Sequence, residues 1–348
     1  MMLLDQVAQR STPFRVSNGG CVIAEQFAHA ATLPGPADFS ERIAACPLRY
    51  VLSDDLVYVC TDLALSDGDR LGACLDLIHL PGRDLWVEWS DVARDHALAK
   101  LSVQGGLSGV IPQGGARRAG ALVSSSVCGR RGLLRTFWSD DSGVVTLAPM
   151  ETHLDLDRGW PALPFQLPVF EGGLVGVNVS DRPEGADLFD CMRFRFDDGW
   201  SAYYRSHKLT AEKRHEILRS SLGAVARDMP MILAFSLLLG ARAALATHRV
   251  ERSRLNKQRR SKNKPPLLEH VEVRCPLIDC SPSSSGAAAF ADVRRPPRLH
   301  HVRGHLVRRG YRVFWRIAHV RGRAAFGKVR SRTVTLSFER TPIGASGA

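Results

Sequence analysis

The last part of the chain lacks acidic residues: no Asp or Glu occurs between residues 293 and 338. This absence argues against a metal-dependent nuclease in that region, because such an enzyme needs carboxylates or similar groups to bind a metal ion or position water. The glycine-rich stretches are not followed by the lysine and serine of a phosphate-binding loop. No nucleophile-elbow, metalloprotease or kinase signature occurs either. The sequence therefore favours a binding protein over an enzyme, and we expect no cofactor.

Cysteines are few, and uninterrupted hydrophobic runs are short. Eight scattered cysteines in 348 residues do not form the dense framework of a small secreted domain, so we expect reduced thiols in a cytoplasm. The apolar start at residues 1–4 is followed at once by Asp5 and is too short for a secretory signal. The best membrane candidate, residues 229–246, is interrupted by Pro230 and Arg242 and predicts a buried helix instead. We therefore expect a cytoplasmic protein with no membrane partner.

Positive charge is abundant, and it is concentrated at one end of the chain. Residues 249–340 hold 23 Lys and Arg against 6 Asp and Glu, a net charge of +17. The whole chain carries +12, so residues 1–248 carry −5, from 24 basic and 29 acidic residues. Clustered arginine beside a mildly acidic body is typical of a surface that meets phosphate or another polyanion. We expect these cations to gather on one solvent-facing surface.

The hydrophobic pattern predicts an α+β fold, with a mixed or antiparallel sheet, a buried helix and a small basic C-terminal β module. Turn residues 53–55 and 140–143 separate some of the expected strands. Thr210 and Asp228 are expected to cap two helices, the second of which is the buried helix. The expected strands of the body are residues 50–52, 56–60, 85–89, 119–126, 132–139 and 144–149.

The length allows two domains, or one large domain with an appended module. The changes in composition divide the chain into four parts. They are a net acidic α+β body (1–248), a basic connector with a strand (249–280), a flexible linker (281–291) and a basic β module (292–340).

The first basic segment, residues 252–264, has two interpretations. Its cations lie at spacings that surround a helix instead of forming a stripe, which suits a solvated helix. Alternatively the segment is an arm that follows phosphates, because Lys and Arg release condensed counterions when they bind a polyanion. The charge imbalance of the whole chain favours the arm.

The second basic segment has the alternation of a small sheet. Residues 311–317 place Tyr, Val, Trp and Ile on one side and Arg, Phe and Arg on the other, after a hairpin turn at 308–310. Residues 330–338 alternate in the same way. We expect Trp315 to be part of a core, while exposed aromatic rings stack on bases. The predicted phosphate contacts of both segments are Lys257, Arg259, Arg260, Arg298, Arg303, Arg308, Arg309, Arg312 and Arg316.

The histidines of this region have three interpretations. If helical, His301 and His305 have metal-ligand spacing and could bind zinc together with Cys275 and Cys280. Alternatively, His300 or His301 serves a nuclease, although the missing acidic residues count against it. The simplest interpretation is that these histidines form hydrogen bonds with the backbone or with phosphate beside Arg303. We therefore expect no metal.

Several motifs resemble a group of uncharacterised phage and prophage proteins. They are an LNKQR segment at 255–259, KPPLLEH at 264–270, PRLHHVRGH at 297–305 and VRG at 320–322, with LWVEW at 85–89 in the first half. The resemblance implies a viral or prophage origin and a bacterial host, and supplies no mechanism. We expect a non-enzymatic accessory protein that binds DNA or RNA. The alternatives are a virion component that docks on an acidic protein partner, and a histidine-dependent nuclease.

Overall fold

A computed structural model gives the fold of this chain. The predicted fold class, α+β with a mixed sheet, a buried helix and a small basic C-terminal β part, is confirmed. The structure describes residues 1–11, 15–18, 21–23, 36–66, 68–105, 116–158, 186–196, 210–241, 244–275, 298–302, 304–316, 319–321 and 323–328.

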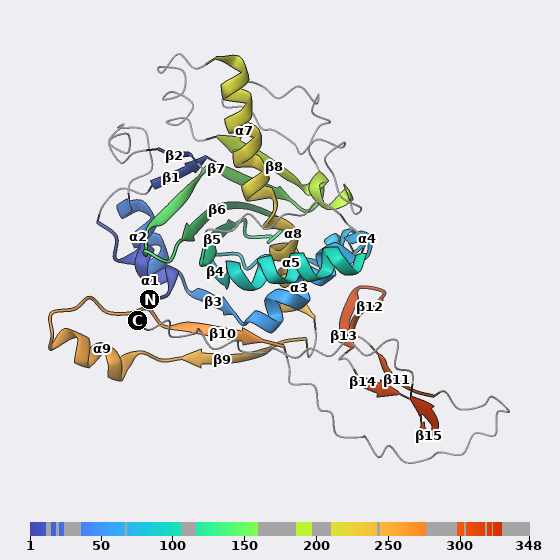
Figure 1. Ribbon diagram of the computed structural model, residues 1–348. Helices are drawn as coiled ribbons and strands as arrows, with labels where there is room; N and C mark the ends of the chain where they lie inside the picture. Colours follow the sequence, from blue (N-terminus) through green and yellow to red (C-terminus); the bar gives the residue numbers. More distant parts are fainter. Residues whose placement is uncertain are drawn as a thin grey trace, which may run out of the picture.

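A mixed sheet of ten strands forms the centre of the molecule (Figure 1). Its order is β2-β1-β7-β6-β5-β4-β3-β10-β9, with β8 paired to β7. The pairs β1–β7, β3–β4 and β3–β10 are parallel, and the remaining pairs are antiparallel. The strands are β1 (Arg15–Asn18), β2 (Cys21–Ile23), β3 (Leu48–Leu52), β4 (Leu85–Ser90), β5 (Arg118–Ser125), β6 (Arg131–Ser139), β7 (Val145–Asp155), β8 (Met192–Phe196), β9 (Ala246–Val250) and β10 (His270–Arg274).

Helices cover both faces of this sheet. The helices are α1 (Leu3–Ala8), α2 (Pro36–Ala45), α3 (Asp54–Ser66), α4 (Gly68–Gly72), α5 (Asp91–Gly105), α7 (Ala211–Ala226), α8 (Met229–Gly240) and α9 (Ser253–Arg260), with short 3-10 turns η2 (Leu75–Leu77) and η4 (Ala186–Cys191). On one face, α3 packs against α5 and α8, and Tyr50 of β3 meets Phe235 of α8 edge to face. On the other face, α1 packs against α2, and Phe39 of α2 meets Phe137 of β6.

Strand β4 shows how the two faces are filled. Trp86 and Glu88 are buried on the α1 side of the strand, and Glu88 accepts hydrogen bonds from the backbone N–H groups of Leu3 and Leu4, each at 2.9 Å. A buried carboxylate at these unsatisfied helix donors fixes α1 on the sheet. Position 120 of β5 requires glycine, because an added Cβ would lie 2.5 Å from the ring of Trp86.

One expected strand is a helix. Residues 56–60 belong to α3, and Asp54 and Asp55, expected in a turn, lie in its first turn. Acidic residues are favourable there because the helix N-terminus carries partial positive charge. The buried residues Leu56, Val57, Cys60, Leu63 and Ala64 follow the spacing of one helical face. The five residues 56–60 are too few to distinguish the repeat of a helix from the alternation of a strand.

The expected buried helix is α8, which ends at Gly240 and not at residue 246, where β9 begins. Residues 221–240 are long and apolar enough to cross a membrane, but 67% of the stretch is buried inside the protein, as in a core helix. Thr210 caps α7 as expected, because its side chain accepts a hydrogen bond from Lys213 N. Asp228 stands at the start of α8, but its carboxylate makes no capping hydrogen bond. It pairs with the guanidinium of Arg94 instead.

The segment expected to be a connector supplies the end of the main sheet. The boundary expected at residue 248 falls inside β9, and β10 lies between β3 and β9. The expected flexible linker 281–291 and the expected strand 330–338 lie outside the described residues. Five short strands follow, in a two-stranded and a three-stranded sheet. They are β11 (Arg298–Val302), β12 (His305–Arg309), β13 (Arg312–Arg316), β14 (His319–Arg321) and β15 (Arg323–Lys328).

Candidate nucleic-acid interface

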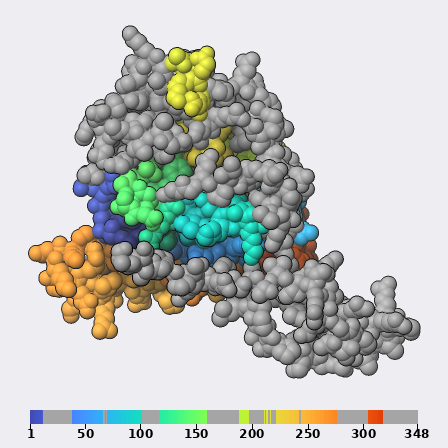
Figure 2. All heavy atoms as spheres, viewed as in Figure 1, coloured from blue at the N-terminus to red at the C-terminus, as the bar shows by residue number. Residues whose placement is uncertain are grey.

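A basic excursion projects from the end of the main sheet. It leaves β9, forms the short helix α9 and returns to β10 (Figure 1). Figure 2 shows these residues, in orange, as a projecting corner of the molecule. No residue of α9 is buried. We call residues 252–264 the basic arm.

Hydrogen bonds, and not packing, hold the basic arm in shape. The side-chain amide of Asn256 donates to Leu267 O and accepts from Leu267 N, both at 2.8 Å. The Nε of Arg259 donates to Pro265 O at 2.8 Å. These bonds fold residues 265–268, which we call the return segment, back along one side of α9. They compensate for the weak intrinsic stability of an eight-residue helix in water.

The return segment is also attached to the body through α1. The Asp5 carboxylate accepts a hydrogen bond from Leu268 N at 2.8 Å, and the Gln9 side-chain amide donates to Pro266 O at 2.9 Å. Helix α1 is itself held in the core by Leu3, Leu4 and Val7, which are fully buried. Burial raises the pKa of Asp5, although the hydrogen bond from Leu268 opposes the rise. The basic arm therefore has a fixed direction relative to the sheet.

The charge of the basic arm has no internal counter-charge. Seven cations and no acidic residue occur in this segment. The neighbouring carboxylates of Glu269 and Glu272 pair with Arg249 at 3.0 Å and Arg274 at 2.5 Å, both outside the arm. Within the described part of the chain, none of these seven cations has a carboxylate within 4.0 Å, and five of them are exposed. They are Arg254, Lys257, Arg260, Lys262 and Lys264.

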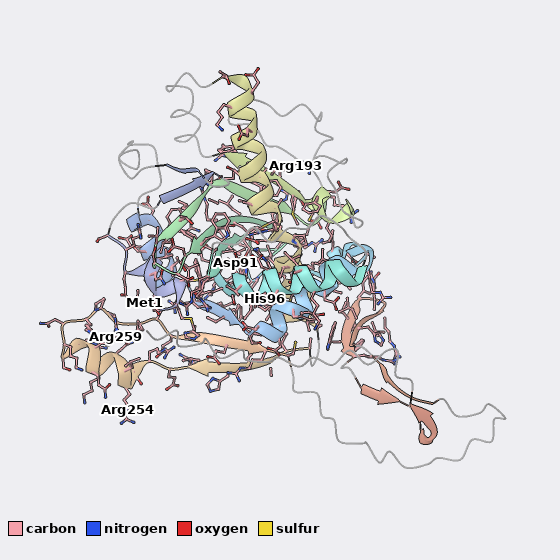
Figure 3. The ribbon with its side chains drawn as sticks, viewed as in Figure 1. Met1, Asp91, His96, Arg193, Arg254 and Arg259 are labelled. Carbon is pink, nitrogen blue, oxygen red and sulfur yellow. The ribbon has the colours of Figure 1, made fainter. Side chains whose placement is uncertain are left out.

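The cations of α9 form a stripe, whereas the sequence suggested that they surround the helix. The return segment covers the side of Asn256 and Arg259, and both side chains are partly buried. Arg254, Lys257 and Arg260 are exposed and lie three residues apart, so they form a row along the part of the helix that the return segment leaves open. Figure 3 shows Arg254 and Arg259 on opposite sides of α9. At 1.5 Å per residue the stripe is about 9 Å long.

This arrangement changes the set of expected phosphate contacts. Lys257 and Arg260 lie in the stripe, whereas Arg259 is turned toward Pro265. Arg254 was absent from the expected contacts although it is exposed in the stripe. The spacing of three residues between Arg254 and Lys257 could have indicated that both lie on one side of a helix. The sequence does not show which side stays exposed, because that depends on where the return segment packs.

The second basic surface is a hairpin of β12 and β13, which we call the basic hairpin (residues 305–316). Gly310 has a φ of 59°, which fits the tight turn between the two strands. The register pairs Leu306 with Trp315 and Arg308 with Val313, so these four side chains share one face. Leu306 and Val313 are buried and Trp315 packs against the core, which confirms the inward position expected for Trp315.

Arg308 fixes the basic hairpin to the body. Its guanidinium forms two hydrogen bonds with the Asp76 carboxylate, at 2.8 and 2.9 Å, and donates to Ala73 O. The hydrogen bonds and the charge of Asp76 raise the pKa of Arg308. A carboxylate of the body therefore neutralises this expected phosphate contact.

The opposite face of the basic hairpin is open. Arg309, Arg312 and Arg316 are exposed and lie around the partly buried Phe314. No ion pair joins these three arginines to a carboxylate among the residues that the structure describes. The expected alternation of Arg and Phe on one side and Val and Trp on the other is therefore confirmed.

The remaining expected residues lie on or beside β11. Arg298, His300 and His301 are part of this strand, where His300 pairs with Arg321 and His301 with Val320 of β14. Arg303 lies outside the described residues. In Figure 1 the strands β11, β14 and β15 and the basic hairpin lie at the end of the molecule opposite to α9. The described cations thus form two separate basic surfaces, whereas we expected one.

The arrangement expected for zinc is not formed by the described residues. The zinc interpretation required His301 and His305 on one helix, but they lie on the strands β11 and β12. Burial and the nearby Asp55 raise the pKa of the Cys275 thiol to about 12, which disfavours the thiolate that a metal requires. Cys280 lies outside the described residues. No group of three or more His, Cys, Asp or Glu suitable for a metal occurs in the part of the chain that is described.

Comparison with protein-family models, with curated proteins and with solved structures finds no match. The charges, contacts and exposure of this chain are therefore what indicate its function. Two buried polar clusters, around Arg94 and around Glu151, are paired within the body. Among the described residues, exposed cations without a carboxylate partner gather on the basic arm and on the open face of the basic hairpin.

Proposed function

We propose that this protein is a non-enzymatic binding protein that contacts the phosphate backbone of nucleic acid through the outer stripe of its basic arm. The observation that supports it best is the stripe of Arg254, Lys257 and Arg260, exposed and without carboxylate partners among the described residues. Like charges at this spacing destabilise an isolated helix. An external polyanion relieves that repulsion and gains entropy from the counterions that it releases.

The composition of α9 favours nucleic acid over a membrane surface. A helix that lies on a membrane inserts an apolar face of Leu, Phe or Trp below the headgroups. Helix α9 has only Leu255 as a large apolar side chain, and Leu255 is 38% exposed. The exposed Ser253 and Gln258 of α9 suit hydrogen bonds to phosphate and sugar.

The fixed direction of the arm supports the same proposal. Asn256, Asp5 and Gln9 connect the arm to the core through side-chain hydrogen bonds. A positioned cation loses less side-chain and backbone entropy on binding than a cation on a free tail. The resemblance of residues 250–325 to phage and prophage proteins fits a protein that meets viral nucleic acid.

The test is a salt titration of binding to labelled 20-base-pair DNA and to an RNA of the same length. It compares the wild type with a variant in which Arg254, Lys257 and Arg260 are changed to Gln. Each phosphate contact adds about 0.9 to the slope of log affinity against log salt on duplex DNA. We expect the variant to bind more weakly at low salt, with a slope flatter by up to about 2.7.

The matched control removes the same charge elsewhere. Changing Arg83, Arg117 and Lys213 to Gln takes three exposed positive charges from three other segments of the body. We expect this control to bind nearly as the wild type does. Equal losses in both variants would mean that only net charge matters. Wild-type affinity that ignores salt, or feeble binding to both nucleic acids, would overturn the proposal and favour an acidic protein partner.

A further inference from the structure

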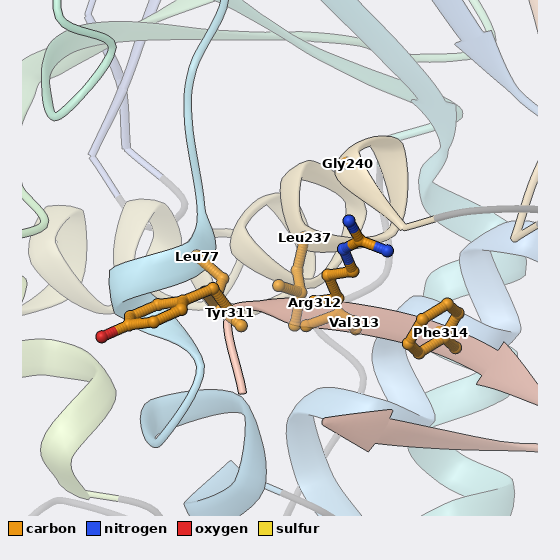
Figure 4. A pocket seen from close by; sticks show the side chains of 7 residues that line it. All are labelled: Leu77, Leu237, Gly240, Tyr311, Arg312, Val313 and Phe314. Atoms are coloured by element: carbon orange, nitrogen blue, oxygen red, sulfur yellow. The ribbon is translucent and has the colours of Figure 1, made fainter. Parts of the chain in front are cut away.

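A pocket lies where the basic hairpin meets the end of α8 (Figure 4). Its volume is about 270 Å³. This volume lies just below the roughly 300–1,000 Å³ of pockets for drug-sized ligands, and it leaves room for one planar ring system. The lining residues are Leu77, Leu237, Gly240, Tyr311, Arg312, Val313 and Phe314.

Aromatic rings and aliphatic side chains line this pocket together. Leu237 of α8 and Val313 of β13 are buried and give it an apolar wall. Tyr311, next to the hairpin turn, is 91% exposed, and no ring of the described residues stacks on it. In Figure 4, Tyr311 and Phe314 lie at the two ends of the lining, with Arg312 between them. An exposed ring of this size next to an apolar wall offers a surface on which another flat ring stacks.

Positive charge surrounds the same opening. Arg312 lines the pocket, and Arg309 pairs with it across the hairpin. Both are exposed, and neither has a carboxylate within 4.0 Å in the described part of the chain. Arg308 and Asp76 hold the hairpin against the body, so the pocket is formed before a ligand arrives. A ligand that matches these features has a flat apolar ring and an attached negative charge.

We propose that the pocket between β13 and α8 binds an unpaired nucleobase, with Tyr311 stacked on the base and Arg309 and Arg312 on the adjoining phosphates. The protein would then prefer single-stranded nucleic acid. The inference rests on the proposed function, because the basic arm supplies further phosphate contacts on the same strand. A base within a duplex presents only its edges in the grooves, so its face cannot enter this pocket. A single strand bends freely and reaches both basic surfaces.

The test uses the full chain and three probes: labelled dT20, the duplex of dT20 with dA20, and thymidine monophosphate as the free nucleotide. The variants are Tyr311→Ala, which removes the ring, and Tyr311→Phe, which keeps it. The exposure of Tyr311 leaves folding unaffected by either change. We expect Tyr311→Ala to weaken binding of dT20 by about 5-fold to 100-fold. Tyr311→Phe should retain wild-type affinity, and duplex binding should be unchanged in both.

The outcomes separate this inference from the proposed function. If Tyr311→Ala binds dT20 as the wild type does, the base pocket is wrong, while loss of binding in the arm variant still supports the proposed function. If the arm variant keeps wild-type affinity and Tyr311→Ala does not, the arm proposal is wrong and the pocket stands. Equal weakening of dT20 and duplex binding by Tyr311→Ala overturns the preference for single strands. Millimolar thymidine monophosphate that displaces dT20 completely would identify the free nucleotide as the ligand and overturn the strand-binding role.

Discussion

The charged residues of the body and those of the basic arm have opposite surroundings. In the body, Arg94 is 1% exposed and contacts three carboxylates, with Asp91 at 2.5 Å and Asp95 at 3.2 Å. In the arm, Arg254 and Lys257 are exposed and have no carboxylate partner among the described residues. Figure 3 shows Asp91 inside the molecule and Arg254 at its outer limit. Charges of the first kind connect helices, and charges of the second kind are open to solvent.

The two environments predict opposite results of mutation. A buried ion pair adds little net stability, because desolvation offsets the attraction, but removing one partner leaves an unpaired buried charge. An exposed cation contributes little to folding and contributes through binding. Stability and nucleic-acid affinity should therefore respond to different residues, and each experiment below tests that separation.

The largest effect is expected from Arg94→Met. The change leaves Asp91 and Asp228, both fully buried, without their main partner at the junction of α5 and α8. Burial already raises the pKa of Asp91, although Arg94 and Arg227 lower it. We expect a loss of about 3–5 kcal/mol in the free energy of unfolding. Urea denaturation measures it.

The control for this experiment is Arg254→Met on the basic arm. This change should alter the free energy of unfolding by less than about 0.5 kcal/mol. If Arg94→Met and Arg254→Met unfold at the same urea concentration, the contrast between body and arm is wrong.

The next largest effect is the loss of stability at low pH that we expect from protonation of Glu151. Burial raises its pKa, but the hydrogen bond with His153 and the charges of Arg135 and Arg195 outweigh burial and lower it from 4.5 to about 2. The lowered pKa stabilises the fold above pH 4.5, and this contribution is lost as the pH falls from about 4.5 to about 2. At about 1.4 kcal/mol per pKa unit, it amounts to about 3 kcal/mol.

Denaturation of Glu151→Gln at several pH values tests this expectation. The variant should be less stable than the wild type at pH 7, and the difference should shrink as the pH approaches 2. Glu269→Gln, which changes a half-exposed residue paired with Arg249 at the surface, serves as the control. A constant difference between Glu151→Gln and the wild type at every pH would contradict the assignment.

Local periodicity predicted most of the sheet and the basic hairpin. The strands β4, β5, β6 and β7 were expected from alternation and turn residues, and the hairpin from Arg308–Gly310 followed by alternating side chains. These patterns lie within about ten residues of one another along the chain, so they can be recognised from the sequence without knowledge of distant contacts. Helix α3 was mistaken for a strand, because Val57, Tyr58 and Val59 favour strands while the buried face of the helix spans more residues.

The candidate site was less predictable because its geometry depends on distant contacts. Which cations stay free is decided by the bond between Asn256 and Leu267, eleven residues apart, and by Arg308 and Asp76, 232 residues apart. Charge counting finds the basic segments but does not distinguish a cation bound to the body from a free one. It therefore included Arg308 and missed Arg254.

A smaller effect is expected from Asn256→Ala in the basic arm. The change removes both hydrogen bonds to Leu267 and leaves the core untouched. We expect the free energy of local opening of α9 to fall by about 1–2 kcal/mol. The free energy of global unfolding should stay the same. Hydrogen exchange of residues 253–268 measures it. Gln258→Ala, an exposed neighbour, should exchange as the wild type does. Unchanged protection in Asn256→Ala would show that the arm is held by something other than this clamp.

The smallest effect is expected from Asp76→Asn, which tests whether a charge of the body fixes the basic hairpin. The change removes the carboxylate that holds Arg308, so amides of β12 and β13 should exchange faster, up to about fivefold, as for an exposed ion pair. Exchanging the partners, with Asp76→Arg and Arg308→Asp together, should restore the protection. The loosened hairpin should also weaken binding of dT20, because Tyr311 and Arg312 no longer stay next to Leu237. Faster exchange with unchanged dT20 binding would mean that the hairpin acts apart from α8, and that the arm alone contacts the nucleic acid.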